Sequence, residues 1–188
     1  MRFKKGQGKE YYTDGKLKFE GEYLYNYKIK GKEFYDDKLE FEGEYLFNKK
    51  WNGKGYDENG NIIYELKNGS GKGKEYDVFG NLEFEGEYLN GKKWNGEINI
   101  YNKKNGNLRF QGKLLNGKKN GKGIVYDSDS SYGGVIFAGE YLNGKKHGYG
   151  RKYAGNRLMY EGEYKIGELW MGKQYDFDGN IVFVGIFK

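Results

Sequence analysis

The residues that could perform acid–base chemistry are one histidine and a recurring set of glutamate pairs. His147 is the single histidine, and the hairpin register described below places it opposite Glu140 on the polar face. A histidine beside one carboxylate, with no nucleophile near it in the pattern, is typical of a polar pair rather than of a catalyst. The glutamate pairs recur with the repeat, whereas a catalytic pair would occur once, in a special environment. We therefore expect no catalytic residue among them: Glu20/Glu22, Glu42/Glu44, Glu85/Glu87 and Glu161/Glu163.

Two acidic segments share part of the pattern of a calcium-binding loop. Their glycines, Gly60 and Gly179, stand at the fourth loop position rather than the sixth, and no glutamate follows at the twelfth. We interpret both as turns and expect neither a metal nor another cofactor. The chain has no cysteine, which excludes disulfides, thiolate catalysis and thiolate metal sites. The two segments are Asp57-x-Asn59-x-Asn61 and Asp176-x-Asp178-x-Asn180.

Paired lysines follow several of the expected turns in a chain whose formal net charge is +6. Acidic residues are interspersed among them, which favours a solubilising surface on a protein with exposed turns and sheet edges. The alternative is an electrostatic surface for an anionic phospholipid membrane, and nucleic acid is a less favoured partner. In either case we expect the pairs to line one edge of the array: Lys49, Lys50, Lys92, Lys93, Lys118, Lys119, Lys145 and Lys146.

An internal repeat organises the whole chain. An aromatic-x-Gly motif recurs about every 23 residues, the length of one β-hairpin with its connection. It begins at Phe19, Phe41, Phe84, Phe110, Phe137, Tyr160 and Phe183, with a degenerate copy at Tyr64. Each copy alternates apolar and polar residues, then turns at a dipeptide such as Asn-Gly. The sequence predicts an all-β chain, 1–188, of about seven to eight hairpins, with the degenerate copy at 64–83 and a terminal strand at 181–188.

The expected turns also predict which residues face each other. A two-residue turn at Asn116-Gly117 pairs Leu115 with Lys118. Counting outward from the turn then places Gly112 opposite Gly121 and Phe110 opposite Gly123. The next copy places Gly139 opposite Gly148 and Phe137 opposite Gly150. In both copies an aromatic ring would cover a glycine of the neighbouring strand.

Copies with one extra residue predict a three-residue turn with a bulge. If Gly86 still faces Gly96, Trp94 falls opposite Tyr88. The same rule places Trp51 opposite Tyr45 and Trp170 opposite Tyr164. All three tryptophans would then share one slot beside a tyrosine. Tyr and Trp suit protein recognition, so we expect a partner-binding groove formed by Tyr45, Trp51, Tyr88, Trp94, Tyr141, Tyr164 and Trp170.

The unit from Phe137 to Gly150 reads Phe-Ala-Gly-Glu-Tyr-Leu-Asn-Gly-Lys-Lys-His-Gly-Tyr-Gly and closely resembles the MORN (membrane occupation and recognition nexus) consensus. The resemblance covers nearly the whole chain. The histidine position is filled once by His147 and once by Asn120, and the copies with an extra residue have Trp-Asn there. Segments such as Gly73-Lys74-Glu75-Tyr76 are similar to a variant MORN repeat found in bacterial proteins, some of them antitoxin-like.

The resemblance implies a single elongated, twisted antiparallel sheet of consecutive hairpins, curved into a half-pipe. It further implies a non-enzymatic scaffold that binds a peptide or helix of another protein along a concave aromatic groove. Binding of anionic phospholipid and an antitoxin or immunity role are the alternatives. The absence of a signal-like apolar run after the basic N-terminus favours a cytoplasmic protein, with membrane or cytoskeletal association left open. The apolar segment from Ile181 to Phe187 is expected to cap the array or to form a homodimer through its edge.

Overall fold

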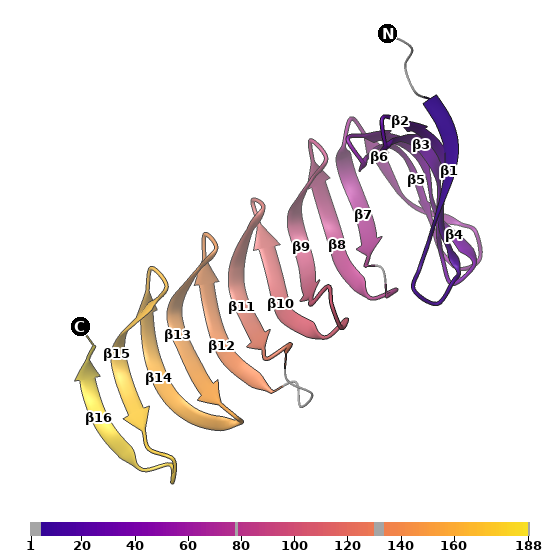
Figure 1. Cartoon of the computed structure of the whole chain (residues 1–188). Coiled ribbons are helices and arrows are strands. Elements are labelled where there is room, and N and C mark those ends of the chain that lie inside the picture. Colours follow the sequence, from indigo (N-terminus) through magenta and orange to yellow (C-terminus); the bar gives the residue numbers. More distant parts are fainter. Residues whose placement is uncertain (1–4, 78, 130–133, 188) are drawn as a thin grey trace. The chain divides into compact units, whose positions relative to one another are not determined.

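A computed structural model describes residues 5–77, 79–129 and 134–187. Within these ranges the chain is all-β, with sixteen strands and no helix. The strands form one antiparallel sheet in chain order, from β1 at one edge to β16 at the other (Figure 1). The predicted fold class, a single sheet of consecutive hairpins, is therefore confirmed. The basic N-terminal residues, the turn residue Val78 and Lys188 of the expected terminal strand lie outside the described residues.

The first nine strands are β1 (Lys5–Tyr11), β2 (Leu17–Leu24), β3 (Tyr27–Tyr35), β4 (Lys38–Leu46), β5 (Lys49–Tyr56), β6 (Ile62–Lys67), β7 (Ser70–Tyr76), β8 (Leu82–Leu89) and β9 (Lys92–Tyr101). The remaining seven are β10 (Leu108–Leu115), β11 (Lys118–Tyr126), β12 (Val135–Leu142), β13 (Lys145–Ala154), β14 (Arg157–Lys165), β15 (Glu168–Tyr175) and β16 (Ile181–Ile186). The chain divides into two compact units, Met1–Trp94 (unit 1) and Asn95–Lys188 (unit 2).

The turn chemistry explains why consecutive strands form hairpins. Asn116 and Gly117 have φ values of 54° and 71°, as a type I′ turn requires, and its twist matches that of the flanking strands. The predicted pairing of Leu115 with Lys118 is confirmed. The two acidic segments are also turns, as predicted. In the first, Asp57 Oδ1 accepts hydrogen bonds from the backbone N–H groups of Asn59 (2.9 Å) and Asn61 (2.8 Å).

The register predicted for the hairpins at Asn116-Gly117 and Asn143-Gly144 is wrong beyond their first residues, because the second strand of each bulges. Gly112 pairs with Gly123 rather than Gly121, and Phe110 pairs with Val125. The first glycine of the Gly-x-Gly motif lies in the bulge, where Gly121 has a φ of 70° that disfavours other residue types. The copy at Phe137 differs from the prediction in the same way, because Gly139 pairs with Gly150 and Phe137 with Lys152.

The bulge brings two glycines face to face beneath an aromatic ring. A β-carbon placed on Gly139 would lie 2.6 Å from Phe137 Cζ and 2.7 Å from the Cα of Gly150. On Gly150 it would lie 2.7 Å from the same ring atom. The expectation that a ring covers glycine therefore holds, although the ring lies over a pair of glycines rather than opposite one.

The predicted tryptophan slot is also wrong. The hairpin of β4 and β5 keeps a two-residue turn, Tyr45 pairs with Lys50, and Trp51 is the extra residue of a bulge. Trp170 occupies the equivalent bulge, while Leu169 pairs with Tyr164. The Trp51 ring lies at the turn edge of the sheet, where a β-carbon on Gly69 would be 2.6 Å from it. The Trp51 carbonyl accepts a 2.7 Å hydrogen bond from the Gly69 N–H, so the bulge connects one hairpin to the next.

Within unit 1 the sheet curls so that strands that are not neighbours meet. Lys18 Nζ of β2 donates to the backbone carbonyls of Tyr76 (3.3 Å) and Asp77 (3.0 Å) at the end of β7. The rings of Tyr35 and Tyr76 stack with their centroids 4.2 Å apart. Lys50, which lies over Phe41, donates to the Lys74 carbonyl of β7 in the same way, so the face that carries the phenylalanines lies on the inside of this curl.

The C-terminal segment adds a strand to the array instead of folding over it as a cap. β16 pairs with β15, with Gly185 opposite Gly172. Its apolar side chains stay largely exposed, from 42 % at Phe183 to 66 % at Val184. The homodimer through this edge stays a prediction.

Candidate functional site: a lysine ladder on the aromatic face

One face of the sheet, here called the aromatic face, holds the core of each unit. Five of the six motif phenylalanines are at most 2 % exposed: Phe19, Phe41, Phe84, Phe110 and Phe137. Tyrosines pack edge-on against them. In unit 2, for example, the Phe137 ring lies 5.8 Å from Tyr141 and 5.2 Å from Tyr164. Such edge-to-face contacts are a favoured geometry for aromatic pairs.

The four tyrosines expected in the binding groove are core residues. Tyr45, Tyr88, Tyr141 and Tyr164 are only 4–8 % exposed, so they offer little ring surface to a partner. Burial raises the pKa of Tyr141 to about 12. The tryptophans are partly exposed, and Lys165 Nζ lies 3.1 Å from the centroid of the Trp170 ring.

The lysine pairs do not form the exposed edge that the sequence predicts. The first lysine of each pair is exposed, but the second is buried at Lys50 and half-buried at Lys93, Lys119 and Lys146. The prediction is wrong for this second lysine because it lies opposite a residue of the aromatic face, as Lys146 does opposite Tyr141 and Lys119 opposite Leu114. Residues directly opposite in an antiparallel ladder point to the same face.

Each of these inward lysines lies over a phenylalanine ring, and so does Lys28 of β3, which lies opposite Tyr23. The distances from Nζ to the ring centroid run from 3.5 to 5.5 Å, which is the range of cation–π contacts. The pairs are Lys28 over Phe19, Lys50 over Phe41, Lys93 over Phe84, Lys119 over Phe110 and Lys146 over Phe137. We call this set the lysine ladder.

In unit 1 each lysine of the ladder has a carboxylate partner. This carboxylate lies on the strand before that of the phenylalanine beneath the lysine, directly opposite that phenylalanine. Glu33 of β3, for example, pairs with Phe41 of β4. Lys50 Nζ lies 2.9 Å from Glu33 Oε2. The same arrangement joins Lys28 to Glu10 at 2.9 Å and Lys93 to Glu75 at 2.8 Å.

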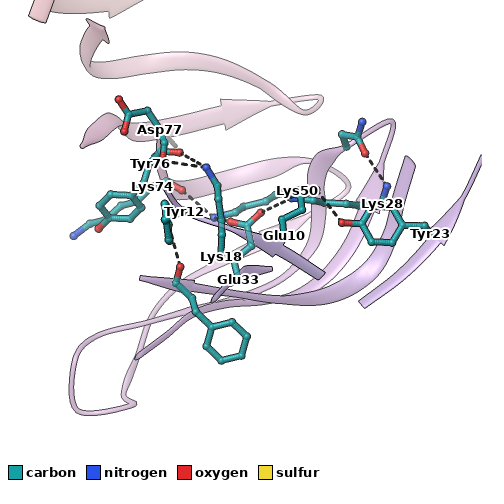
Figure 2. A network of polar contacts seen from close by, with 12 residues as sticks. Glu10, Tyr12, Lys18, Tyr23, Lys28, Glu33, Lys50, Lys74, Tyr76 and Asp77 are labelled. Carbon is teal, nitrogen blue, oxygen red and sulfur yellow. Dashed lines mark hydrogen bonds and ion pairs between the residues drawn. The ribbon is translucent and has the colours of Figure 1, made fainter. Parts of the chain in front are cut away.

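The ion pair of Lys50 and Glu33 is the most buried of the three. The Lys50 side chain is 4 % exposed and that of Glu33 22 %, and Lys50 Nζ also donates to the Lys74 carbonyl at 2.9 Å (Figure 2). Burial alone would raise the pKa of Glu33, but the charges of Lys50 and Lys28 together with the Lys50 hydrogen bond lower it. Glu33 is thus held as a carboxylate between two lysines.

In unit 2 the corresponding positions carry no carboxylate. Ile100 pairs with Phe110 and Val125 pairs with Phe137, so the residues beside Lys119 and Lys146 are aliphatic. Partial burial lowers the pKa of both lysines, and the nearby cations Arg109 and Lys152 lower it further, at Lys119 and Lys146 respectively. Within the part of the chain that the structure describes, no acidic side chain forms an ion pair with either lysine.

A scan against protein-family models and a comparison with curated proteins found no match. The site is therefore interpreted from its own geometry. Among the described residues there is no helix long and apolar enough to span a membrane.

Sequence reasoning missed both the inward lysines and their glutamates. The signal for the lysines was available, because the two-residue turn pairs the second lysine with a residue of the aromatic face. The signal for Glu10, Glu33 and Glu75 was not, since the bulge between turn and glutamate shifts the alternation of faces.

The opposite, polar face holds the residues that suggest acid–base chemistry. His147 is exposed and lies in a bulge, so it is not paired with Glu140 as predicted. Instead, the Glu140 carboxylate lies over Gly148. Glu161 accepts hydrogen bonds from Tyr175 (2.6 Å) and Tyr149 (2.7 Å) and is paired with Arg151 (3.2 Å).

These contacts predict an unusual titration of Glu161. Hydrogen bonds from Tyr175 first and Tyr149 second, followed by that from Arg151, lower the pKa of Glu161 to about 2. A carboxyl group whose pKa is lowered in the folded state stabilises the fold at pH values above its ordinary pKa of 4.5. This contribution is lost as the pH falls from 4.5 towards 2. We expect carboxyl NMR to show a midpoint near 2 that rises in Tyr175→Phe. A midpoint near 4.5 in the unmodified protein would contradict the hydrogen-bonded arrangement.

Proposed function

We propose that this chain is a non-enzymatic, MORN-type scaffold that binds a segment of another protein along its aromatic face. The observation that carries the proposal is the ladder itself. A lysine over a buried ring recurs on β3, β5, β9, β11 and β13. A ligand that is itself a chain with regular side chains suits such a repeating surface better than a compact small molecule does.

The geometry of unit 1 supports binding on this face. A hollow of about 480 Å³ lies over the aromatic face there and is lined by Glu33, Lys50, Tyr88 and Lys93, among others. The Tyr45 and Tyr88 hydroxyls are buried next to the carboxylates of Glu33 and Glu75, respectively, so the lysines and glutamates are the polar groups that a bound segment would meet.

Peripheral binding to an anionic membrane is the second candidate. It is favoured by the exposed first lysines of the pairs, which lie beside the turns at one edge of the sheet. These lysines are Lys49 and Lys92 in unit 1 and Lys118 and Lys145 in unit 2. Because the inward lysines do not belong to this set, the two candidates predict effects from different residues.

The two candidates are separated by peptide display. We expect panning of a random peptide library against the full chain to recover binders whose affinity falls at least about tenfold when Lys119 and Lys146 are both replaced by glutamine. Replacing the neighbouring Lys118 and Lys145 should leave that affinity unchanged. Fluorescence anisotropy of the recovered peptides measures both effects.

Two results would count against the scaffold. Binders that survive the changes to the aromatic face, and also leucine at Trp51, Trp94 and Trp170, would reject it. The scaffold would also be rejected if the library gave no binders while the chain sedimented with phosphatidylserine vesicles in a manner that required Lys118 and Lys145. Far-ultraviolet circular dichroism of each variant provides the folding control.

A further inference from the structure

The two units carry the same ladder but differ in the residue beside it. In unit 1 the partner of the motif phenylalanine is Glu10, Glu33 or Glu75, and each of these glutamates binds a ladder lysine at 2.8–2.9 Å. In unit 2 the equivalent residues are Ile100 and Val125. The cation and the ring beneath it are therefore kept while the carboxylate is not.

We infer that the aromatic face of unit 2 binds an acidic peptide segment, whose carboxylates take the positions beside Lys119 and Lys146 that glutamates of the chain itself occupy in unit 1. The inference rests on the proposed function and specifies the chemistry of the partner. Unit 1 shows what the geometry does with a carboxylate, because three glutamates reach ladder lysines there with closely similar distances.

The surroundings of the two lysines make the site selective for an anion. The charged neighbours that act on them are the cations Arg109 and Lys152. Ile100 and Val125 pack against the core cluster of Phe110, Phe137, Tyr141 and Tyr164. This environment strengthens an ion pair because it is partly shielded from water.

The spacing of the lysines fits an extended peptide that crosses the strands. Lys119 on β11 and Lys146 on β13 are separated by one intervening strand, a distance of about 10 Å. A peptide in the extended polyproline II conformation has three residues per turn and advances about 9 Å over them. Acidic residues at every third position would thus point to the same side and meet successive lysines.

A membrane surface fits these two lysines less well. Both are half-buried and folded onto rings, with Nζ 3.5 Å and 4.1 Å from the ring centroids. A flat anionic surface would first meet the exposed neighbours Lys118 and Lys145. A peptide side chain, in contrast, can reach down to the inward lysines.

The test uses the full chain and a fluorescent synthetic peptide with glutamate at every third position. A peptide with glutamine at those positions is the matched control. We expect saturable binding of the glutamate peptide, at least about tenfold weaker binding of the glutamine peptide, and a similar loss in Lys119→Gln and in Lys146→Gln. The variants Lys118→Gln and Lys145→Gln should bind as the unmodified chain does, which controls for the loss of one positive charge.

A second variant places the missing carboxylate into the chain. In Val125→Glu the new side chain should pair with Lys146 as Glu33 does with Lys50, and binding of the glutamate peptide should fall about tenfold. If Val125→Glu does not fold, the glutamine variants at Lys119 and Lys146 decide the question alone.

Each other outcome overturns the inference. Equal affinity for the two peptides would do so, as would binding that depends on Lys118 and Lys145 or preferential binding to anionic phospholipid vesicles. If peptide display recovers neutral segments that still require the aromatic face, the proposed function stands and only the acidic partner is rejected. If no peptide requires that face, both proposals fail.

Discussion

Replacing Lys50 with methionine is expected to destabilise the fold by about 3–5 kcal/mol, because the change leaves a buried carboxylate without its main partner. The cation left beside Glu33 would be Lys28, at 3.9 Å, and the Lys74 carbonyl would lose its hydrogen bond from Lys50 Nζ. Urea unfolding followed by circular dichroism measures the effect.

The matched changes are Lys49→Met and Lys146→Met. Lys49 is exposed, so its replacement should change the stability by no more than about 0.5 kcal/mol. Lys146 lies over Phe137 at 4.1 Å without an ion pair, so its loss should cost no more than about 1 kcal/mol. Equal losses at Lys50 and Lys146 would contradict the difference between the two units.

The contribution of the Lys50–Glu33 ion pair to the stability of the fold should decrease at acidic pH. Because the pKa of Glu33 is lowered in the folded chain, its contribution is present above the ordinary value of 4.5 and is lost as the pH falls through the folded value. The stability difference between the unmodified chain and Lys50→Met should therefore shrink on acidification below that value.

Replacing Phe137 with alanine is the second change with a large expected effect, about 3–5 kcal/mol. Phe137 is 2 % exposed, and its ring covers the pair of glycines at Gly139 and Gly150. Its loss opens a cavity over bare backbone and removes contacts with two tyrosines. The midpoint of urea unfolding should fall accordingly, since each hairpin depends on its neighbours for stability.

Phe177→Ala is the control for this change. Phe177 lies in a turn of the same unit and is 70 % exposed, so its loss should change the stability by about 0.5 kcal/mol or less. If the two alanine variants unfolded at the same urea concentration, the rings of the aromatic face would not be the core.

The hairpins could be predicted from sequence because the information that specifies them is local. Asn116-Gly117 determines its own turn and the first cross-strand pair, Leu115 with Lys118. The register further along could not be counted, since a bulge adds residues to one strand only. Gly121 and Gly148 lie in those bulges and have positive φ. The sequence alone does not distinguish such a bulge glycine from a glycine that pairs with another glycine across the strands.

The candidate site was only partly predictable for the same reason. The alternation of apolar and polar residues groups the tyrosines with the phenylalanines on one face. Their edge-on packing against buried phenylalanines depends on tertiary structure, which the alternation does not specify. The pairing of Lys93 with Glu75 joins β9 to β7, two strands that are not adjacent in the sheet. Only the curvature of the sheet and the length of the two side chains bring these charges together.

Zero-length cross-linking tests the central claim most directly. A carbodiimide joins a carboxylate to a lysine only where the two are in contact, and mass spectrometry then identifies the lysine. With the glutamate peptide bound to the full chain, we predict cross-links at Lys119 and Lys146 and few at the more exposed Lys118 and Lys145. Cross-links mainly at Lys118 and Lys145, or spread over the exposed lysines of both faces, would contradict binding on the aromatic face.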